Sequence, residues 1–466
     1  MGKSTIAKPI IDKETIFRNP AMGWVLYVDA FSMFEIQEFP EAKEYWGMQD
    51  NNVEMANIFY LRVPWSIMEP KEGCYAWNED DNFKLIIRMA LDRGLKLAFR
   101  VYVDSKDAFM QATPQYVFEA GAKGYANNDN NSGYLTPYLN DPIFQEKLSN
   151  FVHAFSEEYD NPAIVDYIDA QGLGYWGEMH SVHYMTKNQK KQVFEWITNL
   201  YSECFKKVLL GQQYGQNSFH TSLQDWALKE KGYVIRRDSF GSPIWLKDSQ
   251  KEQILAHWPE IPVFAENCYH GFKWREDWYK GDGYSTLHDM MKAVIKDAEE
   301  LHANTLDLRY PQDATLWIKE SPELVRYFAL RCGYRLIPVS VDYPLTIEEN
   351  TPFFIKHMWK NEGFGVLPNH IRNWNWKYKP SFALLDKGTG NPVFQIVDTA
   401  EPSHWVGNQI YEYETEILFD RVPSGEYDLA VAIVNRENES KPEIRLAIKN
   451  ERTSEGWNIL GSVSVQ

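Results

Sequence analysis

Two glutamates, each close to the end of an apolar run, are the residues best suited to chemistry in this sequence. Glu178 lies in the segment 172–180 (GLGYWGEMH), which follows the run 163–170 (AIVDYIDA). Glu266 ends the run 261–266 (IPVFAE). Cleavage of a glycosidic bond needs such a pair of carboxyl groups. One protonates the leaving oxygen, and the other attacks the anomeric carbon or activates water.

Three polar residues near the ends of apolar runs are candidates for contacting a substrate or tuning the two acids. Arg62 lies in the run NIFYLRV, and Asp238 ends the run YVIRRD. Asn267 follows Glu266 directly. A guanidinium beside Glu266 would favour the ionised form of that carboxyl group, as a nucleophile requires. The alternative role for Arg62 is an ion pair within the scaffold.

Aromatic residues make up 15% of the chain, with 17 Trp and 27 Tyr, and are candidate platforms for sugars. Flat aromatic rings with a polar handle can pack against the C–H faces of sugar rings. Four aromatics near strand ends are assigned this role, and a position in the core is the alternative for each: Trp24, Trp65, Trp176 and Tyr310. His180, two residues beyond Glu178, is a further candidate contact to substrate. His180 and His183 lack an evident third ligand, so we expect no metal and no cofactor.

The elements that must position these residues alternate between strands and helices. Short apolar runs, most of them followed by a helical pattern, predict eight strands at 25–28, 57–63, 95–103, 163–170, 207–213, 233–238, 261–266 and 305–310. Such alternation is typical of a parallel sheet, and the count of eight favours a closed (β/α)8 TIM barrel in the α/β class. An open doubly wound sheet is the alternative. The absence of a G-x-G-x-x-G segment after the first strand and of a P-loop argues against a nucleotide site.

From Tyr334 onward the pattern changes to alternating strands separated by turns. Strands are predicted at 335–341, 353–358, 381–385, 415–419, 427–434 and 444–448, with turn signals at 386–390 and 423–425. This pattern predicts a smaller all-β, immunoglobulin-like sandwich. The predicted domains are therefore a barrel over 1–333 and a sandwich over 334–466.

The composition excludes several classes of function. The net charge of −17 argues against nucleic acid, whose binding needs clustered Lys and Arg. The four cysteines are far apart and form no C-x-x-C pair, so neither a zinc site nor a disulfide framework is expected. No apolar run is long enough to span a membrane. The start of the sequence shows no signal peptide, and the compartment stays open: the periplasm or the extracellular space if a leader has been removed, and otherwise the cytoplasm.

Several segments in order along the chain resemble the retaining glycoside hydrolases of clan A, in particular β-galactosidase-like and β-glucanase-like barrels. Residues 62–65 (RVPW) resemble the end of the second barrel strand in that clan. Residues 65–77 (WSIMEPKEGCYAW) resemble the W-S-x-x-E-P-x-x-G-x-Y-x-W/F segment of microbial β-galactosidases. Further segments are similar to a less characterised group of bacterial barrels with a C-terminal sandwich: 19–24 (NPAMGW), 175–180 (YWGEMH), 334–336 (YRL) and 361–363 (NEG).

The resemblance implies a retaining hydrolase of β-glycosidic bonds in a glycan or oligosaccharide. Glu178 would be the acid/base and Glu266 the nucleophile. Many clan members have Asn just before the acid/base, where it contacts the sugar 2-hydroxyl, but this chain has Gly177. An acid must hold its proton, and the apolar side chains of Tyr175 and Trp176 are expected to raise the pKa of Glu178 for that purpose. The alternatives are a non-catalytic carbohydrate-binding barrel and a metal-dependent barrel hydrolase.

Overall fold

The computed structural model describes residues 3–29, 39–104, 110–126, 133–186, 189–215, 219–419 and 421–466. The chain divides into two compact units. The first contains Gly23–Ala329 and Ile371–Asn373; the second contains Met1–Met22, Leu330–His370 and Trp374–Gln466. No helix in the described ranges combines the length and the apolar character needed to cross a membrane.

Eight parallel strands close into a barrel in the first unit, which confirms the predicted TIM barrel. Each strand pairs with the next along the chain, and the last pairs with the first. The barrel strands are β2 (Gly23–Asp29), β3 (Ala56–Pro64), β4 (Lys96–Tyr102), β7 (Val165–Asp169), β8 (Leu209–Gln213), β9 (Tyr233–Phe240), β10 (Val263–Asn267) and β11 (Ala303–Leu308). The strand predicted at 207–213 corresponds to β8.

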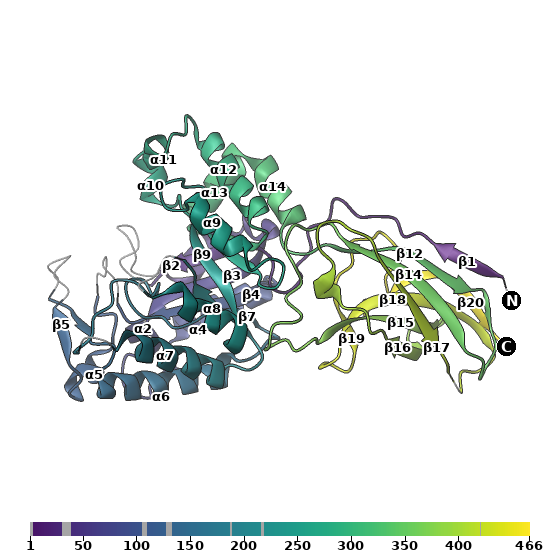
Figure 1. The fold of residues 1–466 in the computed structure, drawn as a ribbon, viewed down its shortest axis with the longest axis horizontal. Coiled ribbons are helices and arrows are strands. Elements are labelled where there is room, and N and C mark those ends of the chain that lie inside the picture. Colours follow the sequence, from purple (N-terminus) through teal and green to yellow (C-terminus); the bar gives the residue numbers. More distant parts are fainter. Residues whose placement is uncertain are drawn as a thin grey trace. The chain divides into compact units, whose positions relative to one another are not determined.

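Every barrel strand is followed by at least one helix before the next strand (Figure 1). The helices are α1 (Ala42–Gln49), α2 (Trp65–Met68), α3 (Ala76–Glu79), α4 (Asp81–Asp92), α5 (Gln115–Glu119), α6 (Pro142–Tyr159), α7 (Lys190–Cys204), α8 (Thr221–Lys231), α9 (Asp248–Leu255), α10 (Phe272–Arg275), α11 (Trp278–Gly281), α12 (Leu287–Glu300), α13 (Pro311–Glu320) and α14 (Pro322–Arg331). A two-stranded hairpin, β5 (Gly124–Ala126) and β6 (Leu135–Pro137), lies between α5 and α6.

Local signals explain where the longer helices begin and end. The carboxylate of Asp80 caps α4, and that of Asp141 caps α6, each by accepting bonds from two backbone N–H groups of the first turn. Pro142 occupies the first turn of α6, where a missing N–H costs nothing. The prediction missed the short helices, such as α2 and α10, because four residues cannot display a helical period.

The barrel interior is built in layers. Ring centroids are 4.4 Å apart for Tyr27 and Tyr60, 6.0 Å for Tyr60 and Tyr167, and 4.7 Å for Tyr167 and Phe264. Because side chains alternate between the two faces of a strand, the residue two positions further on also points inward. That residue is charged in β3 (Arg62), β7 (Asp169) and β10 (Glu266), and Arg100 of β4 stands opposite Arg62. A charged layer therefore lies on the carboxyl-terminal side of an aromatic one.

The second unit is all-β, as predicted. One sheet has the order β1-β12-β14-β17, and the other has the order β13-β20-β18-β15-β16 with β19 on β18. The strands are β1 (Ser4–Ala7), β12 (Leu336–Pro344), β13 (Thr346–Ile347), β14 (Phe353–Asn361), β15 (Tyr378–Asp386), β16 (Pro392–Val397), β17 (Tyr411–Ile417), β18 (Gly425–Asn435), β19 (Lys441–Ile444) and β20 (Asn458–Val465). Strands β1, β13, β16 and β20 were not predicted, and most of the strand predicted at 444–448 lies beyond the end of β19.

Residues 1–22 belong to this second unit, whereas the sequence analysis assigns them to the barrel domain. Strand β1 pairs with β12, with Ser4 opposite Pro344. The side-chain amide of Asn19 donates to the Arg445 carbonyl at 3.0 Å and accepts from its N–H at 2.8 Å. These partners are more than 300 positions away in sequence, so no local pattern could reveal them.

Candidate active site

A cavity of about 790 Å³ opens at the carboxyl ends of the barrel strands, all of its lining coming from the first unit. Active sites of (β/α)8 enzymes are built at this face. The lining residues are Arg62, Trp176, Glu178, His180, Gly215, Asp238, Ser239, Trp245, Gln250, Cys268, His270, Lys273, Trp278 and Arg309. Five predicted site residues therefore meet in one cavity: Arg62, Trp176, Glu178, His180 and Asp238.

The loop after β7 holds Glu178 in an unusual backbone conformation. Trp176 and Met179 have positive φ angles of 55° and 60°, and Gly177 between them has 73°. Positive φ at non-glycine residues is costly and clusters at functional sites. Backbone hydrogen bonds maintain the loop, including Glu178 N–H to the Tyr175 carbonyl at 2.9 Å and Met179 N–H to the Leu173 carbonyl at 2.8 Å.

Gly177 is explained by the space beside it. A Cβ atom built at this position would lie 3.1 Å from Cδ of Arg100 and 3.1 Å from Cβ of Tyr102. A larger residue here would therefore press on the arginine that contacts both glutamates, and glycine lets the backbone approach Arg100 closely.

Glu178 is buried and held by three basic groups. Its Oε1 accepts from Nη1 of Arg62 and from Nη1 of Arg100, both at 3.2 Å, and its Oε2 lies 3.5 Å from Nε2 of His180. Burial by itself would raise the pKa of this carboxyl. The hydrogen bond from His180 and the charges of Arg100 and Arg62 outweigh burial and lower the pKa. The predicted upward shift is therefore wrong, because the charged side of the pocket dominates over its apolar walls.

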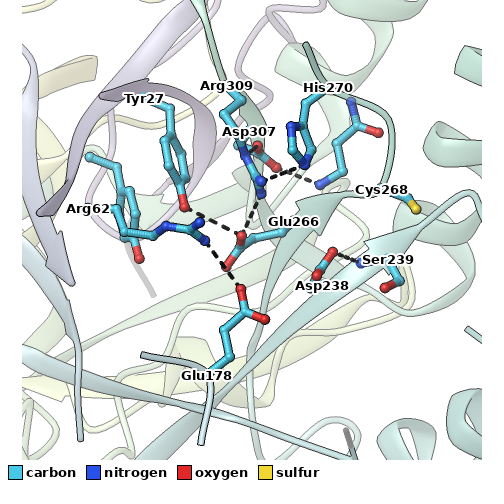
Figure 2. Close-up of polar contacts among 12 residues, drawn as sticks. Tyr27, Arg62, Glu178, Asp238, Ser239, Glu266, Cys268, His270, Asp307 and Arg309 are labelled. Carbon is cyan, nitrogen blue, oxygen red and sulfur yellow. Dashed lines mark hydrogen bonds and ion pairs between the residues drawn. The ribbon is translucent and has the colours of Figure 1, made fainter. Parts of the chain in front are cut away.

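Glu266 is fully buried in β10 and is bound by three arginines. Its Oε1 accepts from Nη2 of Arg100 at 2.7 Å and pairs with Nη2 of Arg236 at 2.8 Å; its Oε2 accepts from Nη2 of Arg309 at 2.7 Å. Burial opposes ionisation, but these guanidinium groups lower the pKa of Glu266 well below the ordinary range. The charge of Arg62 also lowers the pKa of Glu266, as predicted, although its hydrogen bond goes to Glu178 (Figure 2).

Arg100 connects the two glutamates. Its Nη1 donates to Glu178 and its Nη2 to Glu266, while its Nε donates to Asp169 at 2.8 Å. Asp169 also accepts from Nε of Arg236 at 3.1 Å and from the Tyr60 hydroxyl at 2.9 Å. The sequence analysis missed Arg100, Arg236 and Asp169, although a charged residue inside an apolar strand is a signal for a buried ion pair.

Asp238 lines the cavity from an irregular part of β9. Opposite β10, Arg237 aligns with Ala265 and Phe240 aligns with Asn267, so Asp238 and Ser239 together face the single residue Glu266. This two-against-one register is a β-bulge, a device that re-aims side chains next to active sites. Ser239 has a positive φ of 75° and donates its N–H to the Asp238 carboxylate.

The aromatic predictions divide into two groups. Trp176 lines the cavity, with its ring centroid 5.3 Å from that of His180. Trp24 and Trp65 are fully buried and donate their indole N–H groups to the Val325 carbonyl and the Glu69 carboxylate, both at 2.9 Å. They are core residues, so their assignment as sugar platforms is wrong.

Two other predicted contacts have structural roles outside the cavity lining. The amide of Asn267 both donates to the Tyr269 carbonyl at 2.7 Å and accepts from its N–H at 2.9 Å, forming a turn after β10. Tyr310 is buried at the start of α13, 6.0 Å from the His270 ring. Sequence reasoning missed Trp245 and Trp278, which line the cavity and remain 62% and 46% exposed.

The remaining polar side chains show how the cavity is charged. His270 Nε2 lies 2.7 Å from Nη1 of Arg309, and burial together with that guanidinium keeps the pKa of His270 well below its usual value, so the ring is neutral. Burial raises the pKa of the Cys268 thiol to about 11, so this group is not a thiolate at neutral pH. Within the described part of the chain, no three His, Cys, Asp or Glu side chains are grouped to hold a metal ion.

Comparisons with known proteins find similarity only among solved structures. No family model and no curated protein matches the chain. An endo-glycoceramidase II from Rhodococcus sp., in its lactosyl-enzyme form, is 11% identical with a TM-score of 0.42, over 85% of this chain and 97% of that one. A Pseudomonas stutzeri endoglucanase is 11% identical with a TM-score of 0.40, over 69% and 97%.

A third structure, an exo-β-1,4-mannosidase from Opitutaceae bacterium strain TAV5, is 14% identical with a TM-score of 0.40, over 69% of this chain and 59% of that one. All three bear the names of glycoside-cleaving enzymes, the class to which the sequence resemblance points. Their TM-scores are too low to carry an argument. The case for a function therefore rests on the cavity.

Proposed function

We propose that this protein is a glycoside hydrolase that cleaves a β-glycosidic bond by double displacement, with Glu266 as the nucleophile and Glu178 as the acid/base. The observation that carries the proposal is the bridge made by Arg100, whose two terminal nitrogens each hold one of the glutamates. Sharing one guanidinium keeps the two carboxyl groups close. Retaining enzymes need a separation of roughly 5–5.5 Å, whereas inverting enzymes need about 6.5–9.5 Å for an intervening water.

The mouth of the cavity suits a carbohydrate. Trp176, Trp245 and Trp278 line it, and the last two are largely exposed. Exposed indoles beside buried carboxylates offer apolar faces to sugar rings and polar partners to the bond that is cut. A volume of about 790 Å³ accommodates a ligand of oligosaccharide size.

The electrostatics of the site match two of the three roles that the mechanism requires, the nucleophile and the base. Glu266 is ionised, as the nucleophile that attacks the anomeric carbon must be. Glu178 is also ionised, which fits it to accept a proton from the water that releases the sugar. Arg309 lines the cavity, whereas Glu266 lies behind it and does not. Because Arg309 donates to Oε2 of Glu266, the proposal requires this arginine to move before a substrate can reach that oxygen (Figure 2).

The test begins with a panel of β-glycans and aryl β-glycosides, measuring released sugar. Nuclear magnetic resonance of the first product should show the β-anomer from a β-substrate; the α-anomer would contradict the retaining mechanism. The variant Glu266→Gln should abolish turnover, and Glu178→Ala should be rescued by azide with formation of a β-glycosyl azide. Glu323→Gln, an exposed position, is the matched control and should behave like the unmutated protein.

A carbohydrate-binding barrel without catalysis is the second candidate, favoured by the complete burial of Glu266 behind three guanidinium groups. Calorimetry distinguishes the two. Binding of an oligosaccharide with no product, and with equal affinity for Glu266→Gln, would support the binding function and reject the hydrolase.

A further inference from the structure

The proposed double displacement requires a proton donor in the cavity, and the ion pairs of both glutamates favour their ionised forms. Although burial opposes ionisation, the basic partners of each glutamate lower the pKa of its carboxyl group. We propose that Asp238 is the general acid that protonates the leaving-group oxygen, so that acid and base work are divided between Asp238 and Glu178. This inference rests on the proposed function and revises one part of it: the donation of a proton, given above to Glu178, passes to Asp238, and Glu178 keeps the role of base.

The position of Asp238 is the first argument. The bulge in β9 places Asp238 and Ser239 beside Glu266, and both lie in the cavity lining. The positive φ of Ser239 is a backbone strain that an ordinary strand residue would avoid. The irregularity turns an acid toward the space that also holds Glu178 (Figure 2). The strain and the bulge at Asp238 indicate that the orientation of its carboxyl group toward the cavity is important for function.

The partners of the acids are the second argument. Glu178, Glu266 and Asp307 each pair with at least one arginine within 3.3 Å. Asp238 differs, because among the described residues no Lys, Arg or His nitrogen lies within 4.0 Å of its carboxylate, and its hydrogen bond comes from the Ser239 backbone. A carboxyl group without a cation is the one that keeps a proton when several acids share a site.

The electrostatic environment points in the same direction. Burial raises the pKa of Asp238, and the negative charges of Glu178 and Glu266 raise it further. The charges of Lys273 and Arg309 act in the opposite direction and only reduce this shift. The charged and titratable groups that act on Asp238 are Glu178, Arg237, Glu266, Cys268, Lys273 and Arg309. The pKa of Asp238 is thus shifted upward and that of Glu178 downward, although both face the same cavity, and opposite shifts suit the first carboxyl to donate a proton and the second to accept one.

The two chemical steps then balance. In the first, Glu266 forms a bond to the anomeric carbon as the bond to the leaving oxygen breaks, and that oxygen takes the proton of Asp238. In the second, water attacks the anomeric carbon, Glu178 takes the proton of that water, and Glu266 leaves as a carboxylate. Transfer of the proton from Glu178 to Asp238 through solvent restores the starting state.

The decisive experiment compares kcat/KM for a methyl and a dinitrophenyl β-glycoside of the sugar that the panel identifies. The variant Asp238→Asn should lose about 10²–10⁴-fold on the methyl glycoside, the usual contribution of a general acid. It should change little on the dinitrophenyl glycoside, whose leaving group needs no proton. Glu178→Gln should instead release a burst of dinitrophenol and then stall, because it cannot activate water.

The pH profile supplies a readout that a structural role would not move. For the unmutated enzyme on the methyl glycoside, kcat/KM should fall as pH rises through the pKa of Asp238, because the donor loses its proton. That alkaline limb should be absent with the dinitrophenyl glycoside and in Asp238→Asn. Asp225→Asn, a paired acid outside the cavity lining, is the matched control and should keep the limb.

The other outcomes contradict the inference, and they show whether the proposed function fails with it. If Glu178→Gln shows the leaving-group dependence and Asp238→Asn does not, Glu178 performs both roles and the proposed function still stands. If the unmutated protein hydrolyses neither glycoside, the proposed function fails and this inference fails with it. Asp238→Ser replaces Asp238→Asn if the latter does not fold, with melting temperature as the check on folding.

Discussion

Both units bury charged groups, but the barrel and the all-β unit use them differently. In the all-β unit, Asp398 lies 3.3 Å from Nε2 of His357 and accepts from the Ala400 N–H at 2.6 Å and from the Thr415 hydroxyl. His357 Nδ1 in turn accepts from the Trp359 indole at 2.8 Å. Every member is matched by a neighbour, so the cluster acts as a satisfied polar core.

In the barrel, Asp169, Glu178 and Glu266 share Arg100 and Arg236, and one of these acids, Glu178, lines a cavity. A carboxylate that is bound by several guanidinium groups can release one of them and still keep a partner, which a one-to-one pair cannot do. The comparison teaches that burial of charge alone does not indicate function. A shared set of charges beside an open cavity does, because such a site can exchange an internal partner for a substrate.

The largest expected effect comes from Arg100, the residue on which the barrel cluster depends. The variant Arg100→Met leaves three buried carboxylates short of a partner and should lower the free energy of unfolding by about 3–5 kcal/mol, with loss of activity. Arg100→Lys keeps the positive charge but cannot donate to both glutamates at once, as the guanidinium does. It should therefore recover part of the stability but very little of the activity. Urea unfolding measures the free energy of unfolding of each variant, and sugar release measures its activity. A stable, active Arg100→Met would show that the bridge is dispensable.

Acid pH should separate the two clusters. The pKa values of Glu266 and Asp398 are both lowered in the folded state, so each contributes stability above the unfolded-state pKa of about 4. That contribution is lost as pH falls through the lower folded-state pKa. Melting temperature should fall less steeply below pH of about 4 in Glu266→Gln than in Asp398→Asn, because three arginines act on Glu266. Equal slopes of melting temperature against pH in the two variants would contradict this prediction.

The satisfied cluster of the all-β unit should respond in stability and not in catalysis. Trp359→Phe removes the donor to His357 and leaves a buried acceptor unpaired, at a cost of about 1–3 kcal/mol. Trp317→Phe in the barrel makes the same loss of volume at a buried tryptophan and is the comparison variant. Thermal unfolding should show the additional loss for Trp359→Phe. A changed kcat in this variant would mean that the cluster is not merely structural.

The smallest effect concerns the exposed tryptophans at the cavity. Trp278→Ala should raise KM for oligosaccharides by a few fold to about tenfold, with kcat unchanged, since it removes contact that is the same in the ground and transition states. Trp376→Ala, at an exposed tryptophan of the all-β unit, should have no effect. If both variants behave alike, the cavity tryptophans are not sugar platforms.

Much of the scaffold and part of the site follow from the sequence alone. Eight apolar runs with helical patterns between them specify a closed barrel, because the two periods are local properties of consecutive residues. Glu178 and Glu266 could be paired in advance for the same reason, since the carboxyl ends of parallel strands meet at one face. The glycine at position 177 was also visible in the sequence. The reason for it, the close approach of the Arg100 side chain, was not.

Only the tertiary structure decided which charges meet. Arg62 bonds Glu178 and not Glu266, Trp24 and Trp65 lie in the core, and a register shift between β9 and β10 turns Asp238 toward the cavity. These outcomes depend on distances between strands that are far apart in sequence. The protonation of each acid depends on them too, because the pKa of a buried carboxyl is set by the balance between lost hydration and the charges within a few ångströms.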